Sequence, residues 1–170
     1  FTPANEPTAH WSYLYTLYLA GVYAVFGHHP LAARLIQVLL SGLNIWLAFR
    51  IGARLFGEWV GLVAAALTAV YAYLIFFNAT LMTQTFYILA VLGAIDIALG
   101  LAENPTRRGW VLLGITIGIG ALVRQTLLLF APLVFAWIIL TRRWRVQWRD
   151  LIISLSVMGL FILPWTVYNY

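Results

Sequence analysis

The 170-residue chain is 64% apolar and 9% charged, and its mean hydropathy is +0.92. A soluble domain of this length does not need so much apolar surface to form its core. The absence of cysteine excludes a disulfide framework and a thiolate metal site. Every basic residue is arginine and the net charge is +5, but the arginines form no stripe that would bind nucleic acid.

The first predicted element is rich in aromatic side chains. Residues 11–27 include six Trp, Tyr or Phe residues, a composition typical of a membrane–water interface. We therefore expect a juxtamembrane helix over 8–26 on the outer face of the membrane. The alternative is a seventh spanning helix.

Six apolar runs of 14 to 19 residues follow, and Arg34 and Asp96 are the only charges inside them. A 19-residue helix is about 28 Å long, close to the thickness of a hydrocarbon core of about 30 Å. The runs lack the alternation of a membrane barrel, so they predict helices. The predicted spanning helices cover residues 31–56, 58–78, 80–102, 108–124, 126–142 and 150–168. The predicted fold class is an all-α, polytopic transmembrane bundle, with 1–170 as one domain of a longer protein.

The arginines indicate which connections face the cytoplasm, because Lys and Arg accumulate in short cytoplasmic loops. Eight of the ten arginines fall in or beside alternate connections, and only Arg34 and Arg124 fall at the other side. This asymmetry requires that six helices cross and that the aromatic segment does not. The chain is therefore predicted to be a multi-pass membrane protein.

Polar and small residues within the runs have mainly structural interpretations. Asn44 is expected to make one interhelical hydrogen bond, and the Gly114 and Gly118 pair is expected to allow close helix packing. Asp96 lies near the cytoplasmic end of its helix, where we expect it to pair with Arg107 or Arg108.

No catalytic motif is present in the sequence. There are no paired carboxylates, no nucleophile elbow and no phosphate-binding loop, and the histidines lack metal-ligand spacing. The sequence therefore predicts neither a metal nor a cofactor, and it identifies no catalytic residue.

Two positions at the outer side remain as candidates for binding. Arg124 ends the shortest run and is followed by Gln125, so its guanidinium is held at the outer interface, where a lipid phosphate is a suitable bidentate partner. The alternative is snorkelling to the lipid headgroups. Gln84 opens another run from the same side, and a polar helix start facing Arg124 would form a small hydrophilic pocket. A helix cap by Thr80 or Thr83 would explain part of this polar cluster.

The order of several segments resembles a known family. The segments are "NEPTAHWSYLYTLYLAGVYAVFG", "AARLIQVLLSGLNIWLAFRIGARLFGEWVGLVAAAL", "LMTQTFYILAVL", "GITIGIGALVRQTLLLFAPLV" and "LPWTVYNY". In order and spacing they resemble the N-terminal membrane half of lipid-linked-sugar glycosyltransferases of the GT-C fold. The most similar branch contains protein O-mannosyltransferase and the bacterial aminoarabinose transferases.

The resemblance implies a transferase that takes a sugar from a polyprenyl-phosphate carrier at the outer face of the membrane. In this family an acidic residue of the first outer loop acts on the acceptor, and that loop would precede residue 1. The chain departs from the family pattern at Gln84, where Glu or Asp is frequent, and at Tyr168, where Arg is frequent. A glutamine cannot act as a base or hold a divalent ion strongly. The residues expected to bind the lipid-linked sugar are Glu6, His10, Gln84, Arg124 and Gln125.

Two other classes of function stay open. One is a non-catalytic accessory subunit of a membrane assembly, derived from the same fold. The other is a transporter or flippase, which would show internal repeats and broken helices around a midplane site. The sequence does not identify the sugar, the acceptor or the oligomeric state.

Overall fold

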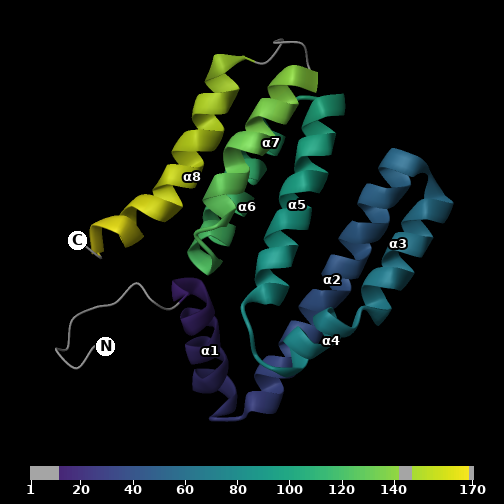
Figure 1. Cartoon of the computed structure of the whole chain (residues 1–170). Coiled ribbons are helices and arrows are strands. Elements are labelled where there is room, and N and C mark those ends of the chain that lie inside the picture. The colour runs from purple at the N-terminus through teal and green to yellow at the C-terminus, as the bar shows by residue number, and fades with distance from the viewer. Residues whose placement is uncertain (1–11, 142–146, 169–170) are drawn as a thin grey trace.

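The computed structural model describes residues 12–141 and 147–168, and its regular structure is helical throughout (Figure 1). Within these ranges there are eight helices and no strand, which confirms the predicted all-α class. The helices are α1 (Tyr13–Phe26), α2 (Pro30–Phe56), α3 (Glu58–Val70), α4 (Ala72–Ala79), α5 (Gln84–Glu103), α6 (Arg107–Val123), α7 (Leu127–Thr141) and α8 (Trp148–Tyr168).

Three helices of the described part are long and apolar enough to cross a bilayer, namely α2, α5 and α8. The α3 and α4 pair meets the same criteria if it counts as one bent span, which gives up to four. The helices α1 and α7 are apolar but shorter. The chain is therefore an integral membrane protein, whereas the predicted total of six spans is not confirmed.

The helix predicted over 58–78 is interrupted in the structure. At Tyr71 the backbone is extended (φ −67°, ψ 112°), and α3 and α4 are bent by 48° relative to each other. No Gly or Pro stands at this break, so the sequence carried no local signal for it. At the other end of α4 the Asn78 side chain is bonded to Thr85 of α5, and this bond ties the end of the short helix to α5. The next helix begins at Gln84 rather than at residue 80.

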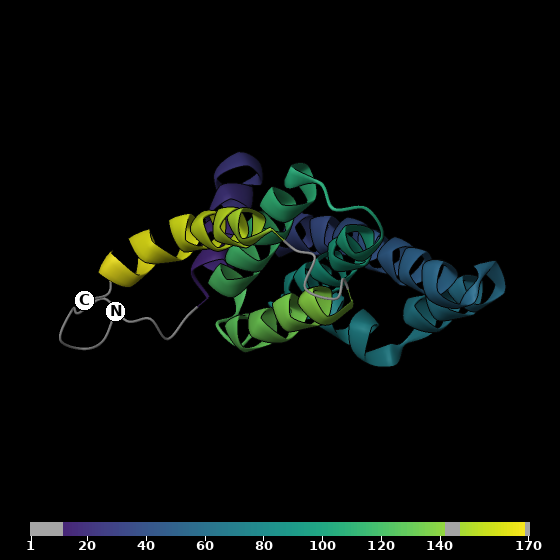
Figure 2. The ribbon, with the colours of Figure 1, turned by 90° about the horizontal axis from the view of Figure 1, so that it is seen from above.

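The helix α5 lies between two packed pairs, α2 with α3 and α6 with α8 (Figures 1 and 2). The close approach of α6 and α8 depends on glycine: a Cβ at Gly114 would overlap the Ser154 carbonyl oxygen, and one at Gly118 would lie 3.1 Å from the Cβ of Phe161. This confirms the predicted role of the two glycines. The buried core lies at the contacts of α5, α6 and α7, where α8 also reaches it. Its members include Ala94, Leu101, Trp110, Leu113, Ile117, Val134, Ile138 and Leu151.

Asp96 does make ion pairs, but with other partners than those expected. Its carboxylate lies 3.0 Å from Arg50 and 3.5 Å from Arg54, not beside Arg107 or Arg108. Arg50 and Arg54 are one turn apart on α2 and therefore share the face that packs against α5. Spacing along the chain favoured the nearer arginines, and the packing of α2 on α5 decided otherwise.

The connections alternate between the two ends of the bundle. Those between α2 and α3 and between α5 and α6 lie at one end, which we call the arginine-rich end (Figure 1). The α1–α2, α4–α5 and α6–α7 connections lie at the opposite end. This arrangement agrees with the arginine pattern of the sequence, and which end faces the cytoplasm stays a prediction.

Cysteine labelling of the full-length protein tests the orientation. His28→Cys and Asn104→Cys place single thiols at exposed positions of the two opposite ends. A membrane-impermeant maleimide should label the cysteine at position 28 in intact cells and the one at position 104 only after permeabilisation. Labelling of both from the same side would contradict the topology.

The crossing of α6 and α8 predicts a second result. Gly114→Ala should lower the free energy of unfolding by about 1–3 kcal/mol, because the added methyl group overpacks the contact with Ser154. Gly42→Ala is the control, since nothing lies within 4 Å of a Cβ there and alanine is the better helix former. Equal stability of the two variants in thermal unfolding would refute the close crossing.

Candidate functional site

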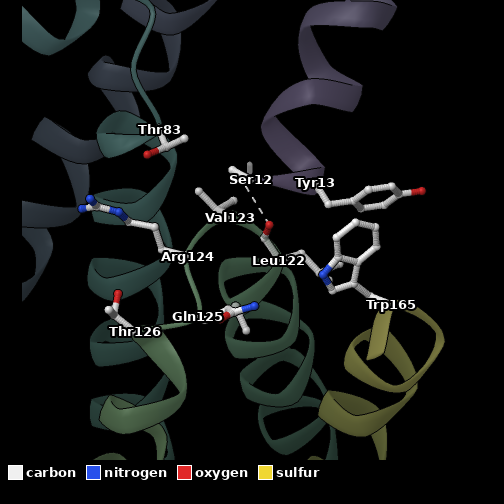
Figure 3. Close-up of a pocket in the computed structure, with 10 residues that line it drawn as sticks. Ser12, Tyr13, Thr83, Leu122, Val123, Arg124, Gln125, Thr126 and Trp165 are labelled. Atoms are coloured by element: carbon white, nitrogen blue, oxygen red, sulfur yellow. Dashed lines mark hydrogen bonds between the residues drawn. The ribbon is translucent and has the colours of Figure 1, made fainter. Parts of the chain in front are cut away.

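A cavity of about 370 Å³ lies at the end of the bundle that carries the α6–α7 turn (Figure 3). Four separate parts of the chain form it: the start of α1, the residue before α5, the α6–α7 turn and the last part of α8. Its lining residues are Ser12, Tyr13, Thr83, Ala121, Leu122, Val123, Arg124, Gln125, Thr126 and Trp165.

Arg124 is the cation of this cavity, and the end of α6 determines its position. Its backbone leaves the helix in an extended conformation (φ −148°, ψ 119°), and its N–H donates to the Gly120 carbonyl over 2.9 Å. The Arg124 carbonyl then accepts from the Leu127 N–H at 3.1 Å, which starts α7. The side chain is exposed, and its Cζ lies 5.7 Å from the ring centroid of Tyr87, within the range of a cation–π contact. No carboxylate of the described residues forms an ion pair with it.

Aromatic rings close the opposite side of the cavity (Figure 3). The rings of Tyr13 and Trp165 have centroids 4.4 Å apart and are inclined by 31°. Both residues, with Leu122, also line a neighbouring cavity of about 420 Å³ whose remaining walls are Phe161 and Pro164. The polar cavity with its one cation therefore shares wall residues with a mostly apolar cavity.

The structure brings together some of the predicted site residues and not others. Arg124 and Gln125 both line the cavity, whereas Gln84 is half-buried and does not. Its neighbour Thr83, a member of the predicted polar cluster for which a helix cap was the alternative, does line it. Glu6 and His10 lie outside the described residues. The binding roles of all these residues stay predictions.

Of the two threonines offered as a cap for α5, Thr83 does occupy the N-cap position. The Thr83 side chain makes no capping hydrogen bond. The Thr80 hydroxyl donates to the Phe76 carbonyl of its own helix at 2.8 Å instead. Thr83 therefore keeps its hydroxyl at the cavity.

Buried polar side chains hold the α4–α5 connection against α2, beside the cavity. The Thr85 hydroxyl donates to the Asn78 amide oxygen at 2.7 Å, and the Asn44 amide donates to the Thr85 carbonyl at 3.2 Å. The Gln37 amide donates to the Met82 carbonyl at 2.9 Å. The predicted interhelical bond of Asn44 is confirmed. Gln37, which is fully buried, was missed, although a lone glutamine in an apolar run was the available signal.

The composition of the lining limits its chemistry. It offers one guanidinium, three side-chain hydroxyls besides the Tyr13 phenol, and one amide, and it contains no carboxylate and no histidine. Such a set can bind an anion through charge and hydrogen bonds. Among the described residues it supplies no general base.

Comparison with known proteins agrees with this description. Residues 11–168 match the family described as dolichyl-phosphate-mannose-protein mannosyltransferase. The chain belongs to this family. The match confirms the resemblance to GT-C glycosyltransferases that the sequence suggested. It covers both the cavity-lining turn at Arg124 and the aromatic helix α1.

A curated relative is the "undecaprenyl phosphate-alpha-4-amino-4-deoxy-L-arabinose arabinosyl transferase 2" of Pseudomonas fluorescens. The two proteins are 28% identical over an alignment of 162 residues that covers 85% of this chain. The chain spans only 28% of the length of that relative. No solved structure matches the chain significantly.

The buried polar cluster generates a stability prediction. Thr85→Val removes the donor to Asn78 and leaves a buried amide oxygen unpaired, so it should lower the free energy of unfolding by about 1–3 kcal/mol. The control is Thr166→Val, whose exposed hydroxyl bonds only to the Ile162 carbonyl of its own helix, and it should change stability by less than about 0.5 kcal/mol. Thermal unfolding in detergent measures both. Similar losses in the two variants would exclude a stabilising role of the cluster.

Proposed function

We propose that the full protein is a membrane glycosyltransferase that takes a sugar from a polyprenyl-phosphate carrier at the outer face of a bacterial cytoplasmic membrane. In this proposal the chain contributes the part that binds the phosphate of the lipid donor. Family membership and the name of the Pseudomonas relative support a lipid-phosphate-linked sugar as the donor. The cavity lies opposite the arginine-rich end, which supports the outer face.

The observation that carries the proposal is the exposed Arg124 in the lining of a polar cavity, without a carboxylate partner among the described residues. A guanidinium binds a phosphate through two parallel hydrogen bonds. When the bond between the sugar C1 and the phosphate oxygen breaks, the electron pair stays on that oxygen and the lipid phosphate gains one negative charge. Arg124 would therefore bind the departing phosphate more strongly than the intact donor, which lowers the barrier.

The neighbouring apolar cavity suits the isoprenoid part of the same donor. It adjoins the polar cavity through Tyr13, Leu122 and Trp165, so a lipid could place its phosphate at Arg124 and its chain along α1, α6 and α8. Thr83 and Gln125 would add hydrogen bonds to the phosphate or the sugar. Gln84, Glu6 and His10 belong to the proposed site as residues that approach the sugar. The catalytic base would come from another part of the protein.

Substitutions at Arg124 test the phosphate contact in the full-length protein. Arg124→Ala should weaken the binding of undecaprenyl phosphate by about 30-fold or more, because truncating one partner of a desolvated charge pair costs roughly 2–5 kcal/mol. Arg124→Lys should also bind it about tenfold less tightly, since an ammonium keeps the charge but loses the planar fork. Native mass spectrometry with added undecaprenyl phosphate measures the affinity.

Arg34→Ala serves as the matched control for this experiment. Arg34 is an exposed arginine in the first turns of α2, at the same end of the bundle, and it lines neither of the two cavities. Its substitution should leave the affinity unchanged. If lysine at position 124 binds as well as arginine and alanine loses less than about threefold, Arg124 is an interface charge and the phosphate proposal fails.

A further inference from the structure

A third cavity, of about 270 Å³, lies at the arginine-rich end between α2, α5 and α6. Its polar lining contains three arginines and one carboxylate, so positive charge is in excess. These are Arg50, Arg54, Arg108 and Asp96, accompanied by Asn104 and Thr106. The remaining walls are Ile97, Gly100, Leu101, Gly109 and Leu112.

Two of these arginines are fixed in place by their partners. Arg50 lies 3.0 Å from the Asp96 carboxylate and 4.7 Å from the ring centroid of Trp46. Arg54 donates to the Asp96 carbonyl at 3.0 Å and lies 3.4 Å from the Glu103 carboxylate. The side chains of Arg50 and Arg54 are 39% and 27% exposed, so their partners do not cover either side chain completely. A site whose cations are already ordered binds an anion at a low entropic cost.

The start of α6 adds a third cation in an unfavourable place. Its first turn begins with Arg107 and Arg108 and contains no acidic residue, although the positive end of a helix dipole favours negative charge. Thr106 caps this turn by accepting from the Gly109 N–H at 3.1 Å. Arg108 lines the cavity and Arg107 does not. An anion in the cavity would relieve the repulsion between Arg108 and the helix end.

We propose that this cavity binds the phosphate headgroup of an anionic phospholipid from the leaflet next to the arginine-rich end. The apolar walls favour a lipid over a free anion: Ile97, Leu101 and Leu112 lie in the same lining as the arginines, and Leu112 is exposed. A headgroup there would touch α2, α5 and α6 at once. It would hold together these three helices, of which α2 and α5 also carry members of the buried polar cluster. This site is separate from the Arg124 cavity and does not depend on the proposed function.

Paired substitutions in the first turn of α6 test the proposal. Phosphatidylglycerol, phosphatidylcholine and inorganic phosphate are each titrated into the detergent-solubilised full-length protein and followed by native mass spectrometry. Arg108→Gln should weaken phosphatidylglycerol binding about fivefold, the effect of one cation near an anionic lipid. Arg107→Gln removes the same charge outside the cavity and should weaken it by less than about twofold.

A variant without a charge change complements this pair. A Cβ at Gly100 would meet only the Arg54 guanidinium, at 3.8 Å, so a side chain can start there without a backbone clash, and Gly100→Leu places an isobutyl group at the cavity. It should weaken phosphatidylglycerol binding at least as much as Arg108→Gln. Circular dichroism and thermal unfolding without lipid establish that each variant is folded.

The alternative outcomes are distinct. Equal losses for Arg107→Gln and Arg108→Gln would indicate unspecific surface charge and overturn the proposal. Equal binding of phosphatidylcholine would exclude a site selective for an anionic headgroup. Displacement of phosphatidylglycerol by inorganic phosphate in millimolar excess would identify a free-anion site instead of a lipid site.

Discussion

Polar side chains between apolar helices must find hydrogen-bond partners inside the protein, because neither lipid nor a packed core supplies one. In this chain Thr85 bonds to Asn78, Asn44 bonds to the backbone at Thr85, and Gln37 bonds to the backbone at Met82. These bonds hold the α4–α5 connection against α2. Thr83 lies in the chain between Met82 and Thr85, whose backbone these bonds hold in place, and it lines the candidate site. The position of the site therefore depends on this buried cluster.

Arginine has different surroundings at the two ends of the bundle. At the arginine-rich end Arg50 and Arg54 share Asp96, which lowers the cost of placing two cations next to apolar helices. At the other end Arg124 has an aromatic ring as its neighbour and no carboxylate partner among the described residues. Pairing with Asp96 orders Arg50 and Arg54 and leaves part of each side chain exposed, whereas Arg124 has no carboxylate among the described residues that competes with an anionic ligand.

Much of this could be read from the sequence. Apolar run lengths predicted an all-helical membrane protein, alternate arginines predicted the two ends, and Gly114 and Gly118 predicted a close helix crossing. Each of these signals is local: it depends on composition or on the spacing of residues within one helix or connection. The motif order also identified the family, and Arg124 with Gln125 was correctly placed at one cavity because the two are adjacent in a tight turn.

The tertiary structure decided what depends on the contacts between distant helices. The pairing of Asp96 with α2, the buried Gln37 and the entry of Tyr13 and Trp165 into the cavity all join residues far apart in the chain, and the break at Tyr71 has no Gly or Pro to mark it. An apolar helix can pack along several faces, and the sequence of one helix does not state which face meets which neighbour. Composition and periodicity thus determined the class and the ends of the molecule. Helix packing chose the partners of those polar side chains that bond from one helix to another.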